Sequence, residues 1–387
     1  MKIQGTTEAQ RHAVDSFRTF LASEVVPVVQ AFRGGPMPRE KMREITQGIA
    51  EFGLPGASIG QAQGGMGLSL VTEAMLLEEL CVVSCEIAHC VIVNMLVASA
   101  LVDLPAARQA LRERYLPELL AGRRLAGIYL HQADALATLA EGGVDAWSTG
   151  HGWVINGAHE RVCNGHYSDF LITGVRNEEG ALCHLLVDRE QHGYASRIID
   201  RRTLIGTFNT RVSFSNVRVP AGHSIWEEQE VPAGLLEKID TDAALLLIGL
   251  ARAVLQKCIA SARIPDDSGR AAASQPLVAL RIAEMATRIE AAKLMCFQAY
   301  SLIDSGTRCR TQALMARWLA SETLLKACQD ALQLPGGKGL GAALDLERLV
   351  RESILLPTPH GLTDTQKLSI AKALTGISVP DPEQPAP

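Results

Sequence analysis

The sequence predicts a mainly α-helical protein with a β-rich part in the middle of the chain. In the first and last parts of the chain, apolar residues recur at helical spacing. Between them, short runs rich in β-branched and aromatic residues alternate with Gly, Asn and Asp. We therefore predict an N-terminal helical domain over 1–122, a middle β domain over 123–230, a C-terminal helical bundle over 231–375, and a disordered, Pro-rich tail over 376–387.

The N-terminal helical domain is predicted from repeated apolar positions. Phe17, Leu21 and Val25 recur at helical spacing, and Met75–Val83 repeats the pattern. Glycines between positions 53 and 67 mark a loop between helices. Gly122 is the predicted end of this block, because glycine readily adopts the backbone conformation that follows a last helical turn.

The middle β domain is predicted from six short runs, from GIYL to TRVSFSNVRVP. Within Gly152–Gly157, the pair Asn156-Gly157 predicts a turn that closes a strand. His159 and His166 lie in predicted turns, so we expect both imidazoles at the surface.

The C-terminal part is predicted to be helical from Ala233 to Leu374. Long helical stretches with few breaks predict a four-helix bundle. One of these stretches carries an apolar stripe formed by Ala279, Ile282, Ala283, Met285, Ala286 and Ile289.

The composition excludes some classes of protein. The 387 residues are 47% hydrophobic and carry a net charge of −5, and no basic run predicts a nucleic-acid interface. The longest apolar stretch that we identify, Ala243–Leu250, is shorter than the roughly 18 residues of a membrane span, so we expect no membrane segment. The N-terminus is polar, and no secretory signal is visible.

Nine cysteines are scattered along the chain, as is typical of reduced thiols in a cytoplasmic protein. Cys81, Cys85, His89 and Cys90 have helical spacings that a metal site could use. Their neighbours are apolar, so we predict buried core residues and no metal site.

Several segments in order resemble the acyl-CoA dehydrogenase family over about residues 8–375. At the C-terminal end, Gly336-Gly337, Glu347-Arg348, Gly361 and Gln366 fall on the family pattern without gaps. The resemblance implies a helical N-terminal domain, a middle β-barrel or sandwich, and a C-terminal four-helix bundle. It also implies an acyl thioester of CoA or acyl carrier protein as substrate, and a homodimer or homotetramer. The other segments are FGLPGASIGQAQGGMGLS, LLEEL, RYLPELLAGRRLAGIYL, FSNVRVP and LRIAEMATRIEAAKLM.

The resemblance implies an FAD site, and the sequence departs from the family at several of its positions. The Thr-Glu-Pro-type loop of the family corresponds to His131–Ala133, and its Trp-Ile-Thr strand corresponds to Arg161–Cys163. The Gly-Gly turn that meets the flavin is kept as Gly336 and Gly337. If FAD is retained, we expect Arg161, Cys163, Gly336 and Gly337 to bind it.

At the segment that contacts the diphosphate of FAD, Asp266 and Ser268 stand where the family has Arg and Phe. Exchanging a cation for a carboxylate about 5 Å from a diphosphate weakens binding by several kcal/mol at an effective dielectric of about 20. We therefore favour a protein without FAD. The alternative is that Arg263 or Arg270 supplies the missing cation and FAD is bound.

Proton transfer is predicted from one histidine and two carboxylates. His360 stands directly before Gly361, where the family has its catalytic glutamate. A neutral imidazole with a pKa of about 6.5 suits proton abstraction at neutral pH. The resemblance places Asp240 and Asp242 within a turn of the expected cavity, as acid or base partners, and His131 as a donor to the thioester oxyanion. The alternative is that His360 fills a loop in a catalytically silent relative.

These residues favour a non-redox enzyme acting on an acyl thioester. It would abstract and return a proton in an isomerisation, dehydration or cyclisation, within a specialised biosynthetic pathway. The first alternative is an FAD-dependent acyl-thioester dehydrogenase with a replaced catalytic base. The second alternative is a non-catalytic assembly subunit.

Overall fold

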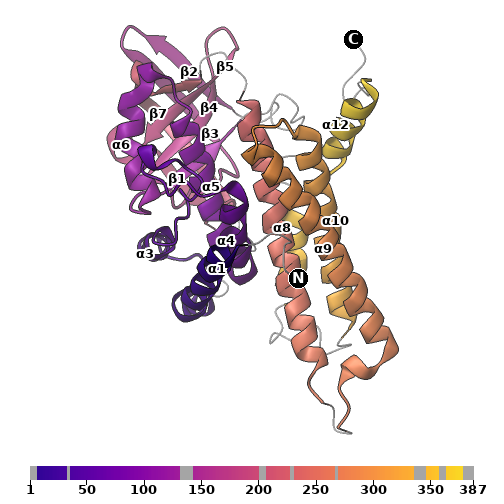
Figure 1. The fold of residues 1–387 in the computed structure, drawn as a ribbon. Helices are drawn as coiled ribbons and strands as arrows, with labels where there is room; N and C mark the ends of the chain where they lie inside the picture. Colours follow the sequence, from indigo (N-terminus) through magenta and orange to yellow (C-terminus); the bar gives the residue numbers. More distant parts are fainter. Residues whose placement is uncertain are drawn as a thin grey trace. The chain divides into compact units, whose positions relative to one another are not determined.

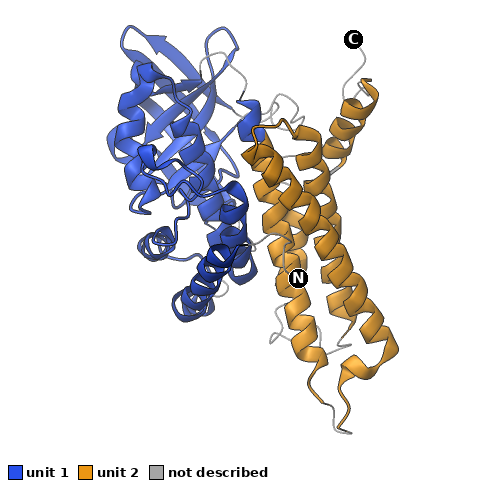
Figure 2. Cartoon of the chain, viewed as in Figure 1, with its two compact units in different colours: residues 1–236 blue, residues 237–387 orange. Residues whose placement is uncertain are grey.

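The computed structural model describes residues 7–32, 35–130, 143–199, 206–226, 231–265, 269–334, 346–356 and 363–377. The chain divides into two compact units, Met1–Leu236 and Glu237–Pro387 (Figure 2). Helices precede and follow a central sheet, so the predicted fold class, mainly α with a central β part, is confirmed.

Unit 1 begins with helices that the sequence specifies locally. Thr7 caps the first helix through a reciprocal pair: its hydroxyl accepts from the Gln10 N–H at 3.2 Å, and its own N–H donates to Gln10 Oε1 at 2.9 Å. Ser84 separates two apolar helices and caps the second of them. The helices are α1 (Glu8–Phe20), α2 (Val26–Ala31), α3 (Arg39–Ala50), α4 (Leu70–Val83), α5 (Cys85–Val102) and α6 (Gln109–Leu120).

Helix α5 packs on strand β1 (Figure 1). Its residues are mostly apolar and mostly buried. By length and composition, α5 and α8 (Ala233–Ala262) could each cross a membrane. The sequence-based statement that no stretch is long enough was therefore wrong. The fold buries 83% of the α5 window, as expected for a core helix.

The sheet of unit 1 has eight strands in the order β6-β7-β3-β2-β4-β5-β8, with β1 paired to β4. Strand β1 runs parallel to β4 and brings Tyr129 level with Thr173. Between β5 and β6 lies the short helix α7 (Arg189–His192). The strands are β1 (Ala126–Tyr129), β2 (Val144–Thr149), β3 (Gly152–His159), β4 (Phe170–Arg176), β5 (Leu182–Asp188), β6 (Ala195–Ile198), β7 (Thr210–Pro220) and β8 (Ser224–Trp226).

The prediction of a turn at Asn156-Gly157 was wrong, because β3 continues through this pair to His159. The register of β3 against β7 shifts between Ile155 and Gly157, which marks a β-bulge. Gly157 has a φ of +121°, and a Cβ there would lie 2.4 Å from the Gly143 carbonyl oxygen. Glycine is therefore required at this position by the close approach of β2 and not by a turn.

The regular elements of unit 2 are helices, joined by short irregular connections, within the residues that the structure describes. Helix α10 is central, because it packs against α9, α11 and α12 (Figure 1). The predicted apolar stripe on α9 is buried at Met285 and Ile289, whereas Ala279 and Ala283 are exposed. Besides α8, the helices are α9 (Pro276–Asp304), α10 (Arg310–Gln333), α11 (Leu346–Leu355) and α12 (Thr363–Thr375).

Candidate functional site

Polar side chains gather in one region of unit 1 and in one region of unit 2. Four residues that the sequence predicts for the site, His131, Gly336, Gly337 and His360, lie outside the described residues. The other four, Arg161, Cys163, Asp240 and Asp242, are described.

Arg161 and Cys163 lie in one turn beside the end of β1. The Ile128 N–H donates to the Cys163 carbonyl at 3.1 Å, which joins the turn to the strand. Arg161 is exposed and has a φ of +56°, so its guanidinium is presented from a left-handed backbone position. Burial raises the pKa of the Cys163 thiol to about 12, so the thiol stays protonated at neutral pH.

Asn164 fixes the turn and was not identified from the sequence. Its side-chain Nδ2 donates to the Cys90 carbonyl at 3.0 Å and to the Ala126 carbonyl at 2.9 Å. Its backbone N–H donates to the Thr207 carbonyl at 2.6 Å. With a φ of +56° and full burial, Asn164 joins α5, β1 and the segment before β7. An asparagine that tolerates the left-handed region was the signal available in the sequence.

His159 is buried, which corrects the expectation of a surface imidazole. Its exposed fraction is 2%, its ring stacks on Tyr129 with centroids 3.8 Å apart, and Nε2 lies 2.9 Å from the Gly174 carbonyl oxygen. His159 faces inward because it lies four residues after the buried Ile155 in the same strand, and side chains at even spacing share one face of a sheet. The extra residue of the register shift belongs to β7, where three steps from Phe214 to Val217 oppose two steps from Ile155 to Gly157. The end of β1 therefore presents a half-buried aromatic ring next to the turn that carries Arg161.

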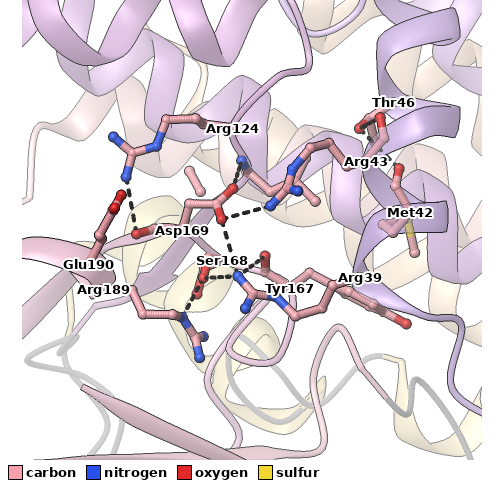
Figure 3. Close-up of polar contacts among 12 residues, drawn as sticks. Arg39, Met42, Arg43, Thr46, Arg124, Tyr167, Ser168, Asp169, Arg189 and Glu190 are labelled. Carbon is pink, nitrogen blue, oxygen red and sulfur yellow. Dashed lines mark hydrogen bonds and ion pairs between the residues drawn. The ribbon is translucent and has the colours of Figure 1, made fainter. Parts of the chain in front are cut away.

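A cluster of arginines surrounds Asp169 at the start of β4 (Figure 3). Asp169 Oδ1 accepts from Arg39 Nη2 at 3.1 Å and from Arg43 Nη2 at 2.9 Å, and Oδ2 accepts from the Leu125 N–H at 2.8 Å. Burial, together with the nearby Arg189, lowers the pKa of Arg39. The cluster ties α3 to the sheet, and its contacts are those of a structural anchor.

His166 lies at the edge of this cluster and is partly buried. Burial lowers its pKa, and the positive charges of Arg39 and Arg189 lower it further. Arg189 donates to the Ser168 and Gly165 carbonyls at 2.8 and 2.9 Å, so it holds the same segment from the other side.

In unit 2, Asp240 lies inside the bundle between two cations. Arg317 Nη1 donates to Asp240 Oδ1 at 2.8 Å, and Arg310 forms a second ion pair with Oδ2. The side chains of Asp240 and Arg317 are 3% and 2% exposed, so water does not screen their interaction.

Asp242 has a separate set of partners. The Tyr300 hydroxyl donates to Asp242 Oδ1 at 2.7 Å, and Lys238 Nζ lies 3.4 Å from Oδ2. The Asp242 side chain is fully buried. The roles of Asp240 and Asp242 as acid or base partners stay predictions. To accept or donate a proton, each carboxylate would have to break the ion pairs described above.

Glu237 extends this charged network and was also missed by the sequence interpretation. Its Oε1 accepts from Arg308 Nε at 2.9 Å and from the Cys309 N–H at 3.2 Å. Together, Glu237, Asp240 and Asp242 line the start of α8 with buried carboxylates, and their cations come from α8 itself, from α10 and from Arg308 directly before α10. Such a cluster in an apolar bundle is a candidate functional region.

The succession of helices, mixed sheet and helices is the acyl-CoA dehydrogenase fold, as the solved structures described below show. The family model for the acyl-CoA dehydrogenase N-terminal domain matches residues 7–123, and the model for the C-terminal domain matches residues 241–375. The chain belongs to the acyl-CoA dehydrogenase family.

Several curated relatives are similar to almost the whole chain. An acyl-CoA dehydrogenase of Bacillus subtilis is 24% identical over 375 residues, which is 93% of this chain and 96% of the relative. Benzylmalonyl-CoA dehydrogenase of Aromatoleum aromaticum is 26% identical over 376 residues, 95% of this chain and 98% of the relative. Among solved structures, glutaryl-CoA dehydrogenase of Mycobacterium smegmatis in complex with FADH2 has a TM-score of 0.86 at 20% identity, covering 97% of this chain and 96% of that one.

The prediction of a protein without FAD is contradicted by these relatives. They are dehydrogenases, and the glutaryl-CoA dehydrogenase structure contains the reduced flavin. The charge argument gave too much weight to the single side chains of Asp266 and Ser268, which lie outside the described residues, and Arg161 is an exposed cation elsewhere in the chain. The relatives give no support to a non-redox reaction.

Proposed function

We propose that the chain is an FAD-dependent dehydrogenase that oxidises an acyl thioester of CoA. The observation that carries the proposal is the match of both helical domains to the family, together with CoA-dependent dehydrogenases that are similar over more than nine-tenths of the chain. Because the relatives are named for CoA thioesters, we favour CoA over acyl carrier protein as the carrier.

The described part of the predicted flavin site fits FAD. Arg161 is exposed and Tyr129 is half-buried in adjoining segments, and a guanidinium and an aromatic ring both suit contact with a planar heterocycle. The backbone of Cys163 would contribute to the same site, and the binding roles of Gly336 and Gly337 stay predictions. When bound, FAD supplies the acceptor for the hydride that leaves the β-carbon of the substrate.

We assign removal of the α-proton to His360, which takes the place of the family glutamate. A neutral imidazole accepts this proton without a change in the flavin site. His131 stays the predicted donor to the thioester carbonyl, and Asp240 and Asp242 stay predicted acid or base partners.

The first experiment asks whether the protein binds and reduces flavin. Protein reconstituted with FAD should keep the visible flavin absorbance through gel filtration, and an acyl-CoA should bleach it under anaerobic conditions. His360→Ala should keep the flavin and lose the bleaching, whereas His151→Ala, an exposed histidine, should behave like the wild type. Protein that binds no FAD, or His360→Ala with unchanged bleaching, would overturn the respective part of the proposal.

We also propose that the protein is a homodimer or homotetramer. Leu277, Leu280 and Leu294 on α9 are 75%, 66% and 58% exposed. They follow one face of the helix together with Ala283 and Ala291, and such an apolar face is typical of subunit contacts. A cytoplasmic location stays a prediction, which the nine free and buried thiols support.

A further inference from the structure

We infer that Arg317 is a positioning residue that fixes the start of α12, the helix directly after the segment that carries His360. It does so by holding Gln366 of α12 against Asp240 of α8. The inference rests on the proposed function, because its importance for turnover depends on His360 acting as the base.

The guanidinium of Arg317 has partners on two sides. On one side, Nη1 donates to Asp240 Oδ1 at 2.8 Å. On the other side, the Gln366 amide oxygen accepts from Nε at 3.2 Å and from Nη2 at 3.3 Å, with the amide orientation assigned from these bonds. The three residues are only 2–4% exposed, so the contacts are made without competing water.

Helix α12 depends on this contact more than on apolar burial. Of its side chains that the structure describes, from 364 to 375, Gln366 is the one that is buried, and Leu374 near the end of the helix is 68% exposed. A second contact lies next to the first, because Lys367 Nζ is 5.7 Å from the centre of the Trp318 ring. Adjacent residues of α10 therefore hold adjacent residues of α12.

The geometry of the guanidinium explains why this contact sets an orientation. Its donors lie in one plane and point in fixed directions, so two bonds to one amide fix both the distance and the angle of the partner. Gln366 lies in the first turn of α12, which begins at Thr363. A rotation of this turn about the helix axis would break both bonds.

The effect on the reaction follows from the sequence separation. His360 precedes Gln366 by 6 residues (366 − 360), so the anchored turn is the near end of the segment that carries the base. A displacement of about 1 Å at a reacting group reduces the rate on the order of a hundredfold. Asp240 then acts through Arg317, as the charge that holds the guanidinium in place.

The test compares four variants. Gln366→Leu and Arg317→Met should lower the rate constant of flavin reduction by about tenfold to a hundredfold, with the substrate dissociation constant changed by less than about threefold. Gln366→Glu keeps an acceptor for the guanidinium and should restore most of the rate. Arg308→Gln is the matched control, because Arg308 pairs with Glu237 on the same network and its side chain is 65% exposed.

Hydrogen exchange of the backbone provides a readout that does not depend on activity. Residues 363–370 should exchange faster in Gln366→Leu and Arg317→Met than in the wild type and in Arg308→Gln. Unchanged exchange overturns the anchor, whether or not the protein reduces flavin. Faster exchange with an unchanged rate of flavin reduction overturns the positioning role. If the wild type binds no flavin, the proposed function fails, and the exchange result still decides the anchor.

Discussion

Replacing His89 by Met should remove a large part of the acid sensitivity of unit 1. His89 lies on α5 with an exposed fraction of 4%, and its Nδ1 has no hydrogen-bond partner within the part of the chain that the structure describes. Its nearest described ring is that of Phe208, with centroids 6.5 Å apart. Burial lowers the pKa of the imidazole from 6.5 to about 4.

The direction of the effect follows from proton binding in the two states. Between the two pKa values, the unfolded chain binds a proton at His89 and the folded chain does not. The free energy of unfolding therefore decreases as the pH falls from about 6.5 towards about 4, and the stability is fully present above this window. Going from about pH 7 to about pH 5 costs on the order of 2 kcal/mol through His89 alone.

Urea unfolding at these two pH values measures this difference. Three of the four tryptophans lie in strands of unit 1, so a Trp318→Phe background makes fluorescence report on that unit. His89→Met should reduce the loss of stability between the two pH values by about 2 kcal/mol. His192 remains in the variant and accounts for a residual slope, because burial also lowers its pKa to about 4. His12→Met, which replaces an exposed histidine of α1, is the control and should keep the pH dependence of the wild type. If His89→Met also keeps the pH dependence of the wild type, the reasoning is refuted.

Three further predictions concern separate contacts. Tyr300→Phe removes the 2.7 Å hydrogen bond to the buried Asp242 and should lower the free energy of unfolding of unit 2 by about 1.5–3 kcal/mol, which the fluorescence of its tryptophan reports in urea. An unchanged midpoint would show that the carboxylate finds another donor. Asp169→Asn removes the counter-charge of two arginines and should destabilise unit 1 by about 1–3 kcal/mol in the same assay, with a smaller difference at high salt. Leu280→Asp should lower the mass of the oligomer in light scattering, whereas Leu374→Asp on α12 should not, and equal masses would exclude the α9 face as the subunit contact.

The helices and strands could be predicted because their signals are local. Apolar residues at helical spacing begin in α1 and lie within α4 and α9, and the six predicted runs coincide with the strands β1 to β5 and with β7. The family resemblance depended on the same local segments and is confirmed. The hydrogen-bond or ion-pair partner of each buried polar group could not be predicted, because that partner lies far away in the sequence.

The Asn156-Gly157 pair in β3 illustrates this limit. Asn156-Gly157 has the composition of a hairpin turn, yet β2 and β7 pair with β3 on both sides and keep the chain extended through it. His159 lies on the same face of β3 as the buried Ile155, and Tyr129 covers it. The histidine was expected at the surface because the pair before it was interpreted as a turn, whereas the strand continues through this pair.

The carboxylates of α8 show the same limit in charge. Asp240 and Asp242 are two residues apart, and the sequence suggested one role for both. The structure gives them different partners: the cation that Asp240 shares with α12 lies 77 residues away, and the hydroxyl that binds Asp242 lies 58 residues away. Replacing Asp240 and replacing Asp242 should therefore affect the reaction differently, and a single variant of each residue can show this.

The error about FAD has a physical cause of the same kind. The argument counted side chains that differ from the family, one by one, at an assumed distance from the diphosphate. In the structure, the turn that carries Arg161 and Cys163 is held by the Cys163 carbonyl and by the side chain of Asn164, and neither contact depends on the residues that changed. A binding turn that is built from backbone groups keeps its shape when its exposed side chains are replaced, so the loss of individual motif residues is weak evidence for the loss of a cofactor.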